Sequence, residues 1–103
     1  MGLRGLEADA LSELSRLALD VGDTQTAVDR AIEALQIAND LCLGLRQTHG
    51  LVVLGQALVR SKNRRLGAAY LRHAKNRADA QGYWLRAREA DEQLRELGED
   101  RDR

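Results

Sequence analysis

The sequence has no proline and no phenylalanine, and among its 103 residues it holds only one cysteine, one tryptophan and two tyrosines. Without proline no helix is interrupted from within, and the scarcity of aromatic residues argues against a sheet. The lone cysteine, Cys42, excludes an internal disulfide bond. The first residues carry acid where a secretory signal needs an apolar stretch, so we expect a cytoplasmic protein.

The sequence also lacks a membrane span and a strong overall charge. Its longest apolar runs are far shorter than the roughly 20 residues that cross a bilayer. Sixteen basic and sixteen acidic residues cancel, which removes any overall attraction toward nucleic acid or anionic lipid. A chain of this length forms one domain, so we expect neither a second domain nor membrane binding.

Alanine, leucine, arginine and glutamate, all strong helix formers, are abundant. Apolar residues recur at helical spacing, and glycine or polar residues separate the segments. The sequence therefore predicts an all-α fold with five helices, at about residues 6–21, 24–43, 46–60, 64–81 and 83–97. We expect Gly22 and Gly82 to end helices, Asp23 or Thr24 to cap the second helix, and residues 61–63 to form a turn.

The pattern repeats after forty residues. Leu14 corresponds to Leu54 and then to Leu94, and the small Ala27 corresponds to Gly67. An internal repeat of this length is typical of stacked helix pairs. A glycine inside a helix costs about 1 kcal/mol relative to alanine. The sequence therefore predicts that the missing Cβ of Gly67 lets two helices approach closely.

These positions resemble the tetratricopeptide repeat family. Its pattern has Leu-Gly, a large apolar residue, and then small, large and small residues in a second helix. The second repeat meets it with Leu54-Gly55, Leu58, Gly67, Leu71 and Ala74, and the first with Leu14-Ser15, Ala18, Ala27, Ala31 and Ala34. The longer period is similar to that of repeats in bacterial regulatory ATPases and transcription activators. The resemblance implies a right-handed α-solenoid of antiparallel helix pairs that binds proteins in a regulatory role.

Two full repeats and one capping helix fill residues 1–97, and residues 98–103 are expected to form a charged, frayed tail. For the last helix we expect an inner stripe of Trp84, Ala87, Ala90, Leu94 and Leu97, and for the first helix one of Leu11, Leu14, Ala18 and Val21. No polar cap covers the N-terminal side of the predicted stack. We therefore expect either that the chain self-associates as a homo-oligomer or that it is part of a longer array.

The resemblance also implies that the first helices of successive repeats line a concave groove. The matching partner-binding positions are Arg16, Leu19, His49, Val52, Gln56 and Val59. The apolar members, Leu19, Val52 and Val59, predict a strip that receives an amphipathic helix. The alternative is that the chain's own neighbouring helix covers this strip. The resulting hypothesis is a non-catalytic module that binds a partner helix or peptide, or another copy of itself.

Charge is balanced overall but not locally. Residues 1–45 hold three basic and eight acidic residues, whereas residues 46–82 hold eight basic residues and one acidic residue. Four of the basic residues share one arc of the fourth predicted helix: Arg64, Arg65, Arg72 and Lys75. This basic face is interpreted as a solvated helix surface, as a docking site for an acidic protein surface, or as a nucleic-acid-binding surface. The zero net charge disfavours the last of these, which is the alternative function.

No catalytic, cofactor or metal site is predicted, and no small-molecule substrate. Cys42 and His49 are separated by a predicted helix break at Gly44, so they do not share one helix face as a zinc pair would need. Cys42 is expected to pack as a small hydrophobic residue near the end of the second helix. Trp84, with Tyr83, could anchor a partner, but we expect Trp84 to cover the last helix pair.

Overall fold

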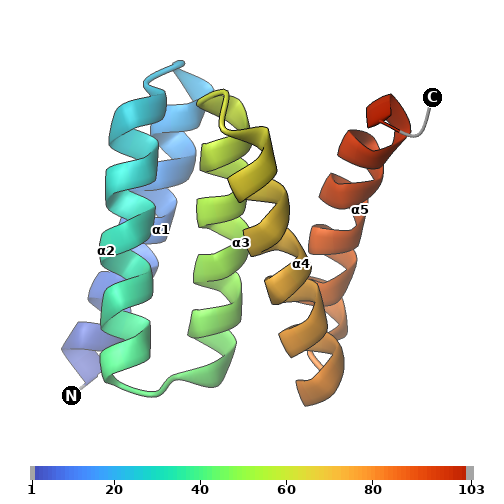
Figure 1. Ribbon diagram of the computed structural model, residues 1–103. Coiled ribbons are helices and arrows are strands. Elements are labelled where there is room, and N and C mark those ends of the chain that lie inside the picture. The colour runs from blue at the N-terminus through green and yellow to red at the C-terminus, as the bar shows by residue number, and fades with distance from the viewer. Residues whose placement is uncertain (1, 102–103) are drawn as a thin grey trace.

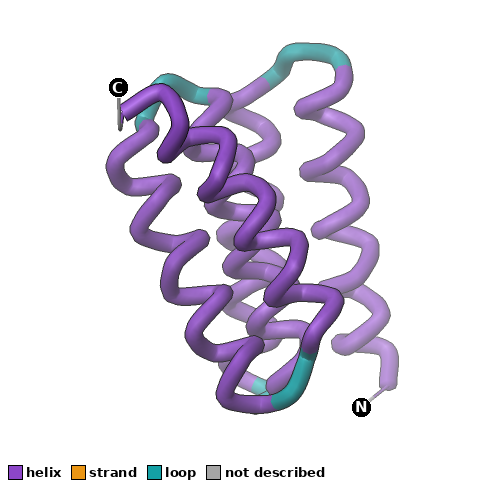
Figure 2. The backbone as a smooth tube through the Cα atoms, turned by 90° about the vertical axis from the view of Figure 1, so that its right-hand side faces the viewer, coloured by secondary structure: helices purple, strands orange, loops and turns teal. Residues whose placement is uncertain are grey.

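The computed structural model describes residues 2–101, with side chains described for residues 3–98 (Figure 1). The described residues form five helices: α1 (Gly2–Asp20), α2 (Thr24–Asp40), α3 (Gly44–Arg60), α4 (Arg64–Gln81) and α5 (Trp84–Arg101). Consecutive helices pack antiparallel to one another and are joined by short turns at alternating ends (Figure 2). The prediction of an all-α fold with five helices is confirmed.

The helices follow one another across the molecule, from α1 and α2 at one end to α5 at the other (Figure 1). Helix α3 contacts α1 and α5 in addition to its neighbours in sequence, α2 and α4. Within the described part of the chain, α2 and α4 do not contact each other. The three odd-numbered helices therefore lie side by side on one face of the molecule. None of the helices in residues 2–101 is long and apolar enough to cross a membrane.

A residue in the left-handed conformation follows each of the first four helices, at intervals of twenty residues. These residues are Gly22, Cys42, Lys62 and Gly82, with φ values of 84°, 54°, 71° and 80°. The predicted helix ends at Gly22 and Gly82 are confirmed, because glycine adopts this conformation without strain. Asp23 caps α2 by accepting a hydrogen bond of 3.2 Å from the backbone nitrogen of Thr26.

The turn between α2 and α3 differs from the prediction. Helix α2 ends at Asp40, not at residue 43, and α3 begins at Gly44, not at residue 46. Cys42 lies in this turn and is exposed, so the expectation that it packs as a hydrophobic residue is wrong. No glycine marks the left-handed position here, which is why the boundary was misplaced.

The predicted tail differs as well. Helix α5 continues as far as Arg101, beyond the predicted helix end at residue 97. Residues 102–103 lie outside the described part of the chain.

The α3–α4 pair is held together by a close approach at two glycines. A Cβ atom at Gly67 would lie 2.8 Å from the carbonyl oxygen of Gly55 and 2.6 Å from Cγ2 of Val59. A Cβ atom at Gly55 would lie 2.8 Å from Cγ of Leu71. All three distances are too short for real atoms, so the prediction that Gly67 permits close packing is confirmed. Around this point the largest buried cluster contains Leu51, Val52, Leu71, Ala74 and Ala90.

The inner stripes predicted for the first and last helices are partly wrong. Helix α1 buries its small side, with Ala8, Ser12, Ser15, Ala18 and Leu19, and leaves Leu14 and Val21 exposed. Apolar and small residues recur at helical spacing on both sides of α1. The side with small residues is buried because it allows α2 and α3 to approach closely. In α5, Ala87 and Ala90 are buried and Leu94 and Leu97 pack against the core, but Trp84 is 69% exposed and does not cover the last helix pair.

Candidate binding site on the inner face

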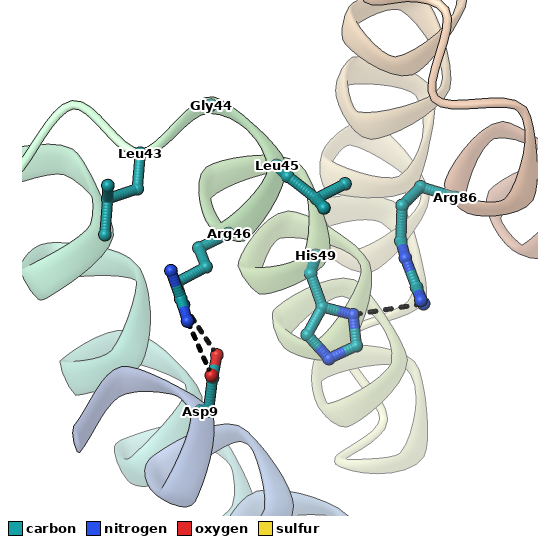
Figure 3. A pocket seen from close by; sticks show the side chains of 7 residues that line it. All are labelled: Asp9, Leu43, Gly44, Leu45, Arg46, His49 and Arg86. Carbon is teal, nitrogen blue, oxygen red and sulfur yellow. Dashed lines mark hydrogen bonds and ion pairs between the residues drawn. The ribbon is translucent and has the colours of Figure 1, made fainter. Parts of the chain in front are cut away.

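The face shared by α1, α3 and α5, here called the inner face, is hollowed by two depressions. The first has a volume of about 390 Å³ and lies where α3 begins (Figure 3). It is lined by Asp9, Leu43, Gly44, Leu45, Arg46, His49 and Arg86. Side chains from three helices thus converge on one surface, as Figure 3 shows.

Asp9 and Arg46 join α1 to α3 at the edge of this depression. The Arg46 Nε and Nη2 atoms donate to the two carboxylate oxygens of Asp9 at 2.8 and 2.9 Å (Figure 3). These hydrogen bonds hold the pKa of Asp9 below its usual value, and the Arg46 charge adds to the effect. A two-point arginine–carboxylate contact fixes direction as well as distance, so it holds the two side chains in one orientation between α1 and α3.

His49 and Arg86 stand forty residues after Asp9 and Arg46, and they make the corresponding contact between α3 and α5. The Arg86 guanidinium lies 3.3 Å from Nδ1 of His49 and also pairs with Glu89 at 2.5 Å. Arginine can only donate, so Nδ1 accepts and the proton of the neutral ring is on Nε2. Burial lowers the pKa of His49, and the charges of Arg86 and Arg16 lower it further. The ring is therefore a neutral group in the first depression.

The second depression has a volume of about 320 Å³ and lies toward the opposite end of the same three helices. Its lining is Glu13, Arg16, Leu17, Leu19, Asp20, Gln56, Arg60 and Gln93. Arg16, Gln56 and Gln93 are half-buried, and within residues 3–98 their side chains have no hydrogen-bond or ion-pair partner. Polar groups that are partly removed from water and unpaired are available to a ligand.

Only some of the predicted groove residues lie on the surface of the inner face. Arg16, Leu19 and Gln56 line the second depression and His49 lines the first. Val52, in contrast, is fully buried in the core, Leu19 is almost so, and Val59 packs against the same core cluster as Val52. The expected open apolar strip is therefore absent from the described residues, because the chain's own helices cover it. The second depression is lined mainly by polar side chains, whereas the first combines polar and apolar ones.

Sequence reasoning missed Arg46, Arg86 and Gln93 as lining residues. Arg46 and Arg86 are forty residues apart, and each contacts a residue thirty-seven positions earlier, namely Asp9 and His49. The forty-residue offset alone pairs these two arginines. This pairing is visible in the sequence and could have identified both residues.

The four residues of the basic face predicted on α4 have different surroundings. Arg64, Arg65 and Arg72 line a third depression of about 320 Å³, together with Ala68, Leu94, Leu97 and Gly98. Lys75 instead pairs with Asp79 on its own helix at 3.2 Å. This depression therefore combines arginine side chains of α4 with apolar residues of α5.

No group of three or more histidine, cysteine, aspartate or glutamate side chains within the described residues is arranged to hold a metal ion. Comparisons of the chain with protein families, with curated proteins and with solved structures find no match.

Proposed function

We propose that this chain is a non-catalytic protein-binding module, built as a tetratricopeptide-like stack of helix pairs, whose inner face receives a peptide segment of a partner protein. The observation that carries the proposal is the set of half-buried, unpartnered side chains of Arg16, Gln56 and Gln93 around one depression. They come from three different helices, so a ligand that satisfies all three must cross the stack. The polar lining favours an extended peptide over an amphipathic helix.

The chemistry of the partner follows from these groups. Arg16 donates to a carboxylate or a main-chain carbonyl, and the two glutamines both donate to and accept from peptide amides. The first depression adjoins an apolar patch of Leu45, Trp84 and Leu85, since Leu45 and Arg86 border both. Exposed tryptophan is enriched among residues that dominate binding energy. The preferred peptide therefore carries an acidic group for Arg16 and a bulky apolar residue for Trp84.

The test is selection of a displayed random peptide library on the immobilised chain. Selected peptides are then measured on Arg16→Ala/Gln56→Ala and on a matched control, Gln36→Ala/Arg88→Ala, whose residues are exposed on α2 and α5 away from either depression. We expect about a tenfold or greater loss of affinity on the first variant and none on the control. Peptides that bind both variants as well as the unmodified chain would overturn the proposal. Since Trp84 is the single tryptophan, its fluorescence reports binding at the apolar patch.

A further inference from the structure

A second surface lies on the opposite side of α1 from its buried residues. It consists of Leu3, Leu6, Ala10, Leu14, Leu17 and Val21, here called the outer stripe. At 100° per residue these six positions fall within an arc of about 80°, along roughly 27 Å of helix. The five large members are between 49% and 80% exposed, and nothing in residues 2–101 covers them. A continuous apolar stripe of this kind marks an interaction surface.

The molecule itself shows what this side of an odd-numbered helix packs against. Forty residues after Ala10, Leu14 and Leu17 stand Gly50, Leu54 and Ala57, which are buried. A Cβ atom at Gly50 would lie 3.4 Å from Cα of Leu35, and Leu54 packs with Ala31, so the preceding helix, α2, covers this side of α3. Helix α2 runs antiparallel to α3 (Figure 1). The outer stripe is therefore shaped to receive one antiparallel helix.

A second copy of α1 meets this requirement. If two α1 helices lie antiparallel about a two-fold axis near residue 12, Leu3 faces Val21, Leu6 faces Leu17, and Ala10 faces Leu14. Beside the axis, Leu14 of each copy then packs against the small Ala10 of the other copy. A two-fold interface needs one patch that is complementary to itself, and the spacing of the outer stripe provides it.

The area is sufficient for a reversible dimer. Burying the exposed parts of five such side chains on each copy, with their polar surroundings, removes roughly 1,000 Å² from water, the lower limit for a specific interface. Obligate dimers bury about twice that area or more. We propose that the chain forms a reversible, antiparallel homodimer through the outer stripes of two α1 helices. This inference does not depend on peptide binding at the inner face.

Sedimentation equilibrium over a wide concentration range tests the proposal. A monomer–dimer equilibrium is expected for the unmodified chain, and it should not weaken at high salt because the contact is apolar. Leu6→Glu/Leu14→Glu should raise the dissociation constant by tenfold or more while leaving helicity unchanged, since both residues are exposed and neither lines a depression of the inner face. The control Leu66→Glu/Leu85→Glu changes two similarly exposed leucines on α4 and α5 and should leave the dimer intact.

Cysteine cross-linking tests the orientation, in a Cys42→Ser background. Positions 6 and 17 meet across an antiparallel interface, whereas two copies of position 6 lie about 18 Å apart along the helix axis. A mixture of Leu6→Cys and Leu17→Cys chains should therefore form a mixed disulfide, and each variant alone should not.

Three results would overturn the proposal. The first is a monomer at all concentrations, which would leave the outer stripe to a foreign helix. The second is a dimer that survives Leu6→Glu/Leu14→Glu or dissociates at high salt, as a contact between acidic and basic segments would. The third is self-linking of Leu6→Cys alone, which indicates parallel helices.

Discussion

Ser15 donates a hydrogen bond of 2.7 Å to the backbone carbonyl of Ala27, and both residues are fully buried. The two belong to α1 and α2, and they stand forty residues before Gly55 and Gly67 of α3 and α4. Each helix pair therefore brings the same two positions together. The first pair joins them with a hydroxyl group, and the second removes both side chains.

Replacement of Ser15 tests the first of these contacts. Ser15→Ala removes the hydroxyl donor without adding volume, so we expect the free energy of unfolding to fall by about 1 kcal/mol. Ser15→Val also inserts bulk into a fully buried position, so its cost should be larger, about 1–3 kcal/mol beyond the alanine variant. Urea denaturation measures both changes. A valine variant as stable as the unmodified chain would contradict the packing described for α1 and α2.

Gly67→Ala tests the second contact. The new Cβ would collide with a backbone oxygen and with Val59, so the two helices must separate and stability should fall by about 1–3 kcal/mol. Gly98→Ala is the control, because it is also a helical glycine but has open space around it. There, alanine should stabilise by about 0.5–1 kcal/mol. If both substitutions are stabilising, helix propensity and not close packing decides at residue 67.

Leu54→Asp is expected to unfold the chain. Leu54 is buried with Ala31, Val53 and Leu58, so the substitution places an unpaired charge in the core. Leu14→Asp changes the position forty residues earlier, which is exposed. At concentrations where the chain is monomeric, it should leave helicity and melting temperature nearly unchanged. Circular dichroism of the two variants distinguishes the positions, and equal loss of structure in both would mean that the register of α1 is wrong.

His49 predicts a loss of stability in mild acid. Its pKa lies below the usual 6.5 in the folded chain, because of burial and the nearby Arg86 and Arg16, although Glu89 and Asp9 oppose this shift. Below pH 6.5 the unfolded chain binds a proton that the folded chain does not, so stability decreases until the pH reaches the folded-state pKa. Above pH 6.5 both states are neutral at this residue and it contributes no slope.

Thermal denaturation between pH 7.5 and pH 5.5 measures the effect. The melting temperature of the unmodified chain should fall over this interval, and that of His49→Gln should fall less. His73→Gln, which changes an exposed histidine, should behave as the unmodified chain does. Identical slopes for all three proteins would show that His49 titrates equally in both states.

The basic face should not bind nucleic acid appreciably at physiological salt. Arg65 and Arg72 flank an apolar floor, Lys75 is paired with Asp79, and the chain has no net charge. Phosphate contacts would give affinity that falls steeply with salt. Duplex binding that persists near 0.15 M salt and is lost in Arg65→Gln/Arg72→Gln would support the alternative function.

Much of the fold could be predicted from periodicity and glycine positions. The five helices, the helix ends at Gly22 and Gly82 and the close packing at Gly67 are all present in the structure. The turn at Cys42 escaped prediction because a non-glycine residue occupies the left-handed position. The orientation of α1 escaped it because both of its sides have helical apolar spacing, and only tertiary packing chooses between them.

The candidate site was less predictable. The repeat positions placed Arg16, His49 and Gln56 on the inner face, but the burial of Val52 depends on how far α5 turns over α3. The hydrogen bonds of Arg46 and Arg86 depend on the same packing of α1, α3 and α5. The rotation between neighbouring helices cannot be predicted from a single sequence.

Every helix contact in the described chain joins helices that are one or two places apart in sequence. Folding therefore requires little loop closure, so we expect a fast-folding chain in which one helix pair forms and the next adds to it. Denaturation should be able to start at either end, with α5 or α1 opening before α3. Hydrogen exchange would then be slowest in α3, which within the described residues is the one helix that contacts all four others.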